Sequence, residues 1–250
     1  MSRLDGWLGL VRSLVVYRRP GRQRALRRFY SELVRPGSLV FDVGAHLGDR
    51  TAAFAGLGAR VIALEPQPNV ARWLRRLVGR RPEVVVLEEA VGARAGTASL
   101  AVSSMNPTVS TLSGRWRADM PERNEGFREV RWDDEVEVPV TTLDLLIARY
   151  GLPDFCKLDI EGYEAEALAG LSRAVPAISV EFVRGGLDVA RACVQRLDEI
   201  GAYRFNAVAG EERVFRFDGW RTAEEMLAWL DNGADDLAFG DLYARTESPS

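Results

Sequence analysis

The stretch LVFDVGAHLGD, residues 39–49, decides the fold of this 250-residue chain. Residues 39–43 form an apolar run of strand length in which Asp42 is the only polar residue. Glycines follow at positions 44 and 48, and a helix is expected from about Asp49 to residue 57. In an open α/β sheet, ligands bind where a parallel strand ends and a helix begins. The stretch therefore predicts a ligand-binding turn.

Short apolar strands alternate with helices along the rest of the chain. Strands are expected at residues 60–64, 84–87, 97–102, 155–158 and 177–182, with helices at 49–57, 69–78, 144–150, 163–171 and 189–200. This rhythm is typical of a doubly wound α/β sheet, mostly parallel, with helices on both faces. Residues 203–208 and 213–217 are expected to complete it as an antiparallel pair. Residues 103–135 interrupt this alternation. They are predicted to form a long loop, and loops of this length are often functional.

Composition places the chain among ordinary globular proteins. Hydrophobic residues make up 47% and charged residues 28% of the sequence, and no apolar run reaches the length of a membrane span. The two cysteines, Cys156 and Cys193, form neither a C-x-x-C pair nor a metal-binding spacing. Unpaired cysteines of this kind fit a reducing compartment, so we expect a cytoplasmic location.

Charge separates the N-terminus from the rest of the chain. Residues 1–36 contain nine arginines and two acidic residues, a net charge of +7, so the other 214 residues carry −10 of the overall −3. We therefore expect a basic helical N-terminal extension, residues 1–36 with helices at 4–17 and 21–34, and one catalytic domain, residues 37–250. The extension packs on the domain or contacts a membrane surface or a protein partner. The acidic domain disfavours nucleic acid as a partner, and an oligomer is compatible with this composition.

The first turn distinguishes between three cofactor classes. A phosphate loop of the G-x-x-x-x-G-K-[ST] type requires a lysine, but the only lysine is Lys157. A dinucleotide turn requires G-x-G-x-x-G, and its second and third glycines would fall on His46 and Asp49. The turn suits S-adenosylmethionine, because the Asp42 carboxylate would attract its cationic ammonium and repel a pyrophosphate. The predicted cofactor residues of the turn are Asp42, Gly44, Ala45, His46 and Gly48.

Two further strand ends extend the predicted cofactor site. Glu65 and Pro66 end the second strand, where a carboxylate can accept hydrogen bonds from both ribose hydroxyls. Glu89 and Ala90 follow the third strand, and their backbone or the Glu89 side chain could frame the adenine.

The segment FCKLDIEGYE, residues 155–164, places charged side chains at another strand end. If the strand stays extended, Lys157, Asp159 and Glu161 share one side. We expect Asp159 nearest the transferred methyl group, with Lys157 or Glu161 arranging it; the alternative is a salt-bridge cluster that only braces the turn. Because His46 is the only histidine, it is the only imidazole that could act as base. Two acids one residue apart are weak evidence for a metal, so no metal site is predicted.

Several of these motifs together resemble the FkbM family of S-adenosylmethionine-dependent methyltransferases. The resemblance covers residues 36–244 and is carried by VFDVGA (40–45), LEP (64–66), VPVTTLD (138–144), KLDIEGYE (157–164) and FGDLYA (239–244). It implies a seven-stranded, Rossmann-like class I methyltransferase sheet and O-methylation of a hydroxyl on a secondary metabolite or sugar. His46 departs from the family, which more often has asparagine there.

Two other functions remain open alongside the small-molecule O-methyltransferase. An N-methyltransferase would use the same fold, although the chain lacks the Asn/Asp-Pro-Pro-aromatic tetrapeptide. A catalytically silent S-adenosylmethionine-binding scaffold would use the basic N-terminus for docking. In an enzyme, residues 103–135 would cover the cofactor as a lid, with Trp116 and Trp132 either stacking on the acceptor or packing inside the protein.

Overall fold

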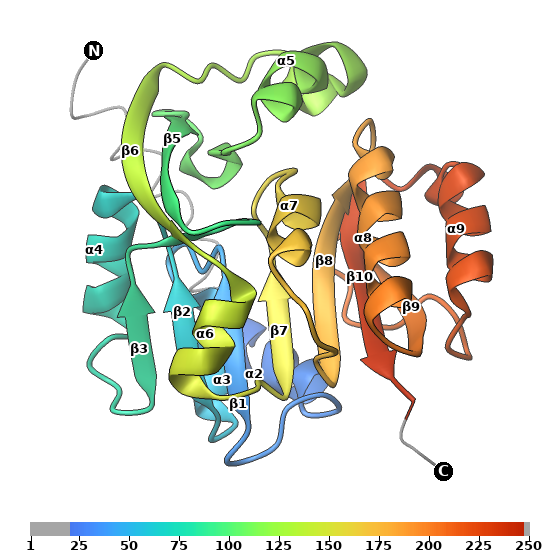
Figure 1. Ribbon diagram of the computed structural model, residues 1–250, viewed down its shortest axis with the longest axis horizontal. Coiled ribbons are helices and arrows are strands. Elements are labelled where there is room, and N and C mark those ends of the chain that lie inside the picture. Colours follow the sequence, from blue (N-terminus) through green and yellow to red (C-terminus); the bar gives the residue numbers. More distant parts are fainter. Residues whose placement is uncertain (1–20, 248–250) are drawn as a thin grey trace.

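The computed structural model describes residues 21–247, which contain a central seven-stranded sheet (Figure 1). The strand order is β3-β2-β1-β7-β8-β10-β9. Within this sheet β10 runs in the direction opposite to that of the other strands. The strands are β1 (Leu39–Val43), β2 (Arg60–Leu64), β3 (Val84–Leu87), β7 (Phe155–Leu158), β8 (Ala177–Val183), β9 (Tyr203–Ala209) and β10 (Phe239–Thr246). The predicted mostly parallel α/β sheet is therefore confirmed.

Helices cover both faces of this sheet because successive strand residues point to opposite faces. Phe41 and Val43 of β1 belong to the apolar cluster on the face covered by α6 (Leu143–Tyr150), α7 (Glu164–Ala169), α8 (Leu187–Ile200) and α9 (Ala223–Asp231). Val40 belongs to the cluster on the other face, with α2 (Arg22–Tyr30), α3 (Asp49–Gly56) and α4 (Pro68–Leu77). The two cores hold the strand ends in fixed register.

That register creates a buried polar row on the face covered by α2 and α3. Asp42 of β1 is paired with Lys157 of β7, Lys157 with Ser179 of β8, and Ser179 with Tyr243 of β10. All four residues are buried. Buried charges are normally paired or hydrogen-bonded, so this row indicates a site rather than ordinary core.

A second, three-stranded sheet stands beyond the carboxyl ends of the central strands, above β2 and β3 in Figure 1. Its order is β4 (Ala90–Val91), β6 (Asp134–Thr141) and β5 (Gly96–Val102). The predicted strand at 97–102 therefore lies here and not in the main sheet. Much of residues 103–135 is ordered into η1 (Pro107–Val109), α5 (Gly114–Arg123) and η2 (Glu125–Phe127).

One predicted strand pairing is wrong. Residues 203–208 were expected to pair with 213–217, but β9 pairs with β10 along its whole length. The side chains of residues 239–246 alternate between the two apolar clusters, as expected for a strand inside the sheet. Leu242 and Ala244 belong to one cluster and Tyr243 to the other. Residues 213–217 form no strand, and Phe215 packs against Phe29 of α2.

The N-terminal expectations are met only in part. The helix expected at 21–34 is α2, which spans Arg22–Tyr30. The helix expected at 4–17 lies outside the described residues. Within residues 21–247 no helix is both long and apolar enough to cross a membrane, and the domain boundary at 36/37 stays a prediction.

Candidate active site

A cavity of about 570 Å³ opens where β1, β2, β7 and β8 end and β10 begins. It is lined by nearly all the residues that the sequence pointed to: Asp42, Gly44, His46, Glu65, Pro66, Glu89, Ala90, Lys157, Asp159 and Glu161. Ala45 and Gly48 lie in the same turn but do not line the cavity. Strand ends far apart in the sequence thus meet around one space.

The glycines of the first turn are required by the packing of the chain itself. A Cβ atom on Gly44 would lie 1.8 Å from the carbonyl oxygen of Asp159, and one on Gly48 would lie 2.6 Å from the Leu74 side chain. Both glycines also have positive φ, 80° and 82°, which other residues adopt only at a cost. The glycines therefore allow the turn to pack against its neighbours in the fold. The sequence had suggested only that Gly44 allows the backbone to approach a ligand closely.

Asp42 is the buried carboxylate of this turn. It accepts a hydrogen bond of 2.5 Å from the Thr51 hydroxyl of α3. Burial raises its pKa, and the charge of Lys157 opposes that rise. Asp42 therefore connects β1, α3 and the neighbouring strand β7, and it contributes to the cavity wall at the same time.

Glu65 has the geometry expected of a diol-binding carboxylate. One oxygen accepts from the backbone N–H of His46 at 3.0 Å, and the other accepts from the backbone N–H of Gln67 at 2.9 Å. Each carboxylate oxygen can accept a second hydrogen bond, and Glu65 lines the cavity. Burial raises its pKa to about 7. The two backbone donors fix the side chain in place.

His46 also lies in the cavity wall, with a positive φ of 48°. Burial lowers the pKa of its imidazole to about 4. The ring is therefore mostly neutral at pH 7.

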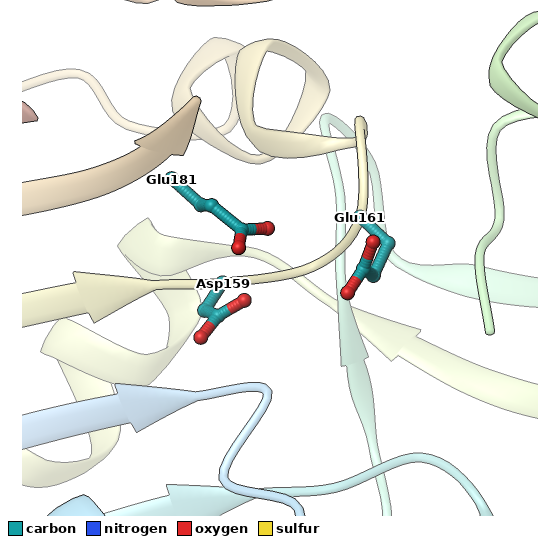
Figure 2. Close-up of side chains that lie close together, drawn as sticks. All are labelled: Asp159, Glu161 and Glu181. Atoms are coloured by element: carbon teal, nitrogen blue, oxygen red, sulfur yellow. The ribbon is translucent and has the colours of Figure 1, made fainter. Parts of the chain in front are cut away.

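At the other end of the cavity, three acidic side chains converge. Strand β7 ends at Leu158, and the chain then turns through Glu161, whose φ is 54°. The strand does not stay extended, yet carboxylate oxygens of Asp159, Glu161 and Glu181 all lie within 4.8 Å of one another. Figure 2 shows Glu181 reaching from β8 toward Asp159 and Glu161, which come from the turn after β7. We call these three residues the acidic cluster.

Lys157 neutralises one member of the acidic cluster. Its ammonium lies 2.5 Å from the Asp159 carboxylate, and the lysine side chain is only 2% exposed against 30% for Asp159. The charge of Lys157 helps to keep the pKa of Asp159 low despite burial. The oxygen spacing alone would admit a divalent ion, but the bonded ammonium would repel one.

Glu164 braces the turn that carries the acidic cluster. Its carboxylate accepts from the backbone N–H of Ile160 at 2.9 Å, and burial raises its pKa to about 7. Glu164 therefore helps to fix this turn. The sequence reasoning had not selected this residue, although its place in the first turn of a helix was a signal.

Other cavity residues were also missed. Arg50 and Asp241 line the wall, as do Glu211 and Tyr163. Arg50 forms an ion pair of 3.3 Å with Glu211. Asp241 was detectable only from strand alternation, because it faces the same side as Tyr243.

The N-terminal helix is joined to the start of α3. Arg22 forms a 2.6 Å ion pair with Asp49, and the Gln23 amide donates to the same carboxylate at 2.7 Å. Asp49 is the first residue of α3, directly after the turn. Helix α2 thus supports the turn from outside the cavity.

Residues 103–135, which we call the lid, are attached to both ends of the cavity. The Gln67 amide donates to the carbonyl of Pro107 at 2.9 Å, and the Thr111 hydroxyl donates to the carbonyl of Glu161 at 2.7 Å. Trp116 packs against Gly162, and the Trp132 indole donates to the carbonyl of Val109 at 2.9 Å. Both tryptophans are packing residues.

Replacing Trp116 by alanine is expected to lower the free energy of unfolding by about 3–5 kcal/mol, as for other buried aromatic side chains. The indole is 6% exposed, packs edge-on against Phe127 and fills the space over Gly162. Urea denaturation measures the change. Trp73→Ala on α4, where the ring is half-buried, is the control and should cost clearly less. Equal losses in the two variants would contradict the role of Trp116.

A central sheet in this strand order, with a cavity at its carboxyl ends walled by a glycine turn and an acid after β2, defines the class I methyltransferase fold. The model of the Methyltransferase FkbM domain matches residues 42–237, and the chain belongs to this family of methyltransferases.

The chain is also similar to individual proteins. The 31-O-demethyl-FK506 methyltransferase FkbM of Streptomyces tacrolimicus is 29% identical over 230 residues, which cover 80% of this chain and 84% of that protein. Among solved structures, the precorrin-6y C5,15-methyltransferase of Geobacter metallireducens has a TM-score of 0.45 and 14% identity, covering 90% and 86% of the two chains. A TehB-like SAM-dependent methyltransferase of Corynebacterium glutamicum has a TM-score of 0.44 and 12% identity, covering 89% and 88%.

Family and fold imply S-adenosylmethionine as methyl donor. The residues present fit such a group, because Glu65 is held by two backbone donors and each oxygen keeps a lone pair for a ribose hydroxyl. An acidic wall also suits a donor that carries positive charge.

Proposed function

We propose that this chain is an S-adenosylmethionine-dependent O-methyltransferase that acts on a hydroxyl of a small molecule, either a secondary metabolite or a saccharide. One observation supports the proposal most strongly. A single cavity has in its wall Glu65, whose two oxygens are held by backbone donors and can each accept a further hydrogen bond, and also the acidic cluster.

Within this proposal the two ends of the cavity have different tasks. Glu65 holds the ribose, and Pro66, Glu89 and Ala90 frame the adenine; Gly44, His46 and Asp159 border the methionine part. The cofactor supplies an activated methyl group. Asp159 and Glu161 orient the acceptor hydroxyl and accept its proton, which typically contributes about 10²–10⁴ to the rate. The lid excludes water from the reaction.

The choice of a small acceptor rests on the cavity and on the relative. A volume of about 570 Å³ lies in the range of about 300–1,000 Å³ typical of small-molecule sites. The Streptomyces tacrolimicus relative is by name an O-methyltransferase of 31-O-demethyl-FK506. A contact of residues 1–36 with a membrane or protein, an oligomer and a cytoplasmic location stay predictions.

Calorimetric titration with S-adenosylhomocysteine tests the cofactor site. We expect micromolar binding by the wild type, lost in Glu65→Ala and in Asp42→Ala, with Glu166→Gln on the exposed side of α7 as the control that binds normally. Because Asp42 also bonds Thr51, circular dichroism must show that this variant is folded. A folded wild type that binds nothing would refute the enzyme and the silent cofactor-binding scaffold alike.

An acceptor screen then separates the remaining alternatives. Hydroxyl compounds and their amine analogues are incubated with cofactor and protein, and products are identified by mass spectrometry and by the carbon chemical shift of the new methyl group. Methyl transfer to amines alone would favour the N-methyltransferase. Cofactor binding without any transfer would favour the scaffold.

A further inference from the structure

The acidic cluster holds more carboxylates than its cations can balance. Asp159 forms its ion pair with Lys157, which is the only cation of residues 21–247 bonded to the cluster. Glu161 and Glu181 add two further carboxylates whose oxygens lie within 4.8 Å of Asp159 and of each other. Carboxylates this close repel one another, and with a single bonded ammonium at least one of them favours its protonated form.

The surroundings indicate which group keeps the proton. Asp159 has Lys157 beside it and also feels the charge of Arg50, so its pKa is lowered. Glu181 is surrounded by acids from every element packed against it: Asp159 and Glu161 from the turn after β7, Glu164 from α7 and Asp241 from the paired strand β10. Burial and these charges raise the pKa of Glu181 well above its ordinary value.

A hydrogen bond joins the two groups. The Asp159 and Glu181 side chains are hydrogen-bonded to each other. Because a carboxylate has no donor, one of the two must carry the proton, and the lowered pKa of Asp159 and raised pKa of Glu181 assign it to Glu181. Asp159 is thereby held from two directions, by the Lys157 ammonium at 2.5 Å and by the Glu181 hydroxyl.

We infer that Glu181 is a positioning residue of the methyl-transfer site, which as a neutral carboxylic acid donates to Asp159 and, with Lys157, holds that carboxylate as an oriented anion facing the cavity. The inference rests on the proposed function for the meaning of the site, but the protonation of Glu181 does not depend on it. Asp159 thereby stays charged beside the reacting groups.

Two variants separate a donor from a charge. Glu181→Gln keeps a donor to Asp159 without a negative charge, whereas Glu181→Ala removes the donor. Glu166→Gln is the matched control, because it makes the same exchange at an exposed position of α7. Infrared difference spectra at pH 7 should contain the carbonyl band of a protonated carboxyl group in the wild type and in Glu166→Gln. One such band should be missing in Glu181→Gln, and an unchanged band would overturn the inference.

The second readout needs no acceptor. Sinefungin carries a cationic amine where S-adenosylhomocysteine carries a neutral thioether. The ratio of their dissociation constants therefore measures how strongly the Asp159 carboxylate attracts a positive charge at that position. We expect the wild-type preference for sinefungin to remain within about twofold in Glu181→Gln and to fall at least about fivefold in Glu181→Ala. Equal losses in both variants, or no loss in either, would overturn the positioning role. If the wild type binds neither probe, the proposed function fails and the infrared band alone decides the protonation of Glu181.

Discussion

Asp159→Asn is expected to lower turnover by at least about a hundredfold, within the range of about 10²–10⁴ for a lost acid–base or orienting group. The variant keeps the size of the side chain but removes the negative charge that lies 2.5 Å from Lys157 and faces the cavity. Affinity for S-adenosylhomocysteine should change by no more than about fivefold, because Glu65 lies on another strand end and keeps its two backbone donors.

The measurement is single-turnover methyl transfer with an acceptor found by the screen, together with calorimetry. Loss of the charge also leaves the buried Lys157 without its ion-pair partner, so urea denaturation must accompany the kinetics. Asp198→Asn, at an exposed position of α8 outside the cavity, is the control with the same chemical change. Unchanged turnover in a folded Asp159→Asn variant would exclude a catalytic role for this carboxylate.

Glu65→Gln is expected to weaken the binding of S-adenosylhomocysteine by about 10- to 100-fold at pH 8, since hydrogen bonds to charged groups contribute about 1.5–3 kcal/mol. The pKa of Glu65 is raised by burial from 4.5 to about 7. Wild-type affinity should therefore increase from pH 6 to pH 8, as Glu65 loses its proton and becomes a full acceptor for both ribose hydroxyls. The variant should bind with an affinity that is nearly independent of pH in this range.

The same pKa shift has the opposite effect on stability. A carboxyl whose folded pKa exceeds its unfolded pKa stabilises the fold at low pH, and this contribution is lost as the pH rises from about 4.5 to 7. The unprotonated form costs about 3 kcal/mol relative to the protonated form. Glu65→Gln should therefore show a smaller decline of unfolding free energy between pH 5 and 8. Glu164, whose pKa is also about 7, still titrates in the variant and contributes to the remaining slope. A pH dependence of both binding and stability identical to wild type would contradict the assignment.

Local patterns predicted the central sheet well. Apolar runs that end in glycine or an acid identify parallel strands, and VFDVG, LEP and KLD each marked a strand end that reaches the cavity. The pairing of β9 could not be found in this way, because residues 213–217 follow β9 more closely in the sequence than residues 239–246 do. The position of β10 between β8 and β9 is evident only in the folded sheet.

Residues of the candidate site could be predicted where the end of a single strand places them. They could not be predicted where their properties depend on charges from several elements. Glu65 was predicted from its position after β2, and it lines the cavity. Burial lowers the pKa of His46 to about 4, and this burial cannot be predicted from the sequence of one turn. The contacts of Asp159 depend on Glu181 and Lys157 coming from two neighbouring strands. Neither their distances nor their shared proton has a signature in the sequence.

The attachment of the lid bears on the order of kinetic events. The lid accepts a hydrogen bond from the Gln67 side chain, two residues after Glu65, and donates one to the backbone carbonyl of Glu161 in the acidic cluster. A movement of the lid that frees one end of the cavity therefore disturbs the other end. In an enzyme of the proposed kind, binding of the donor and binding of the acceptor would be coupled through this segment.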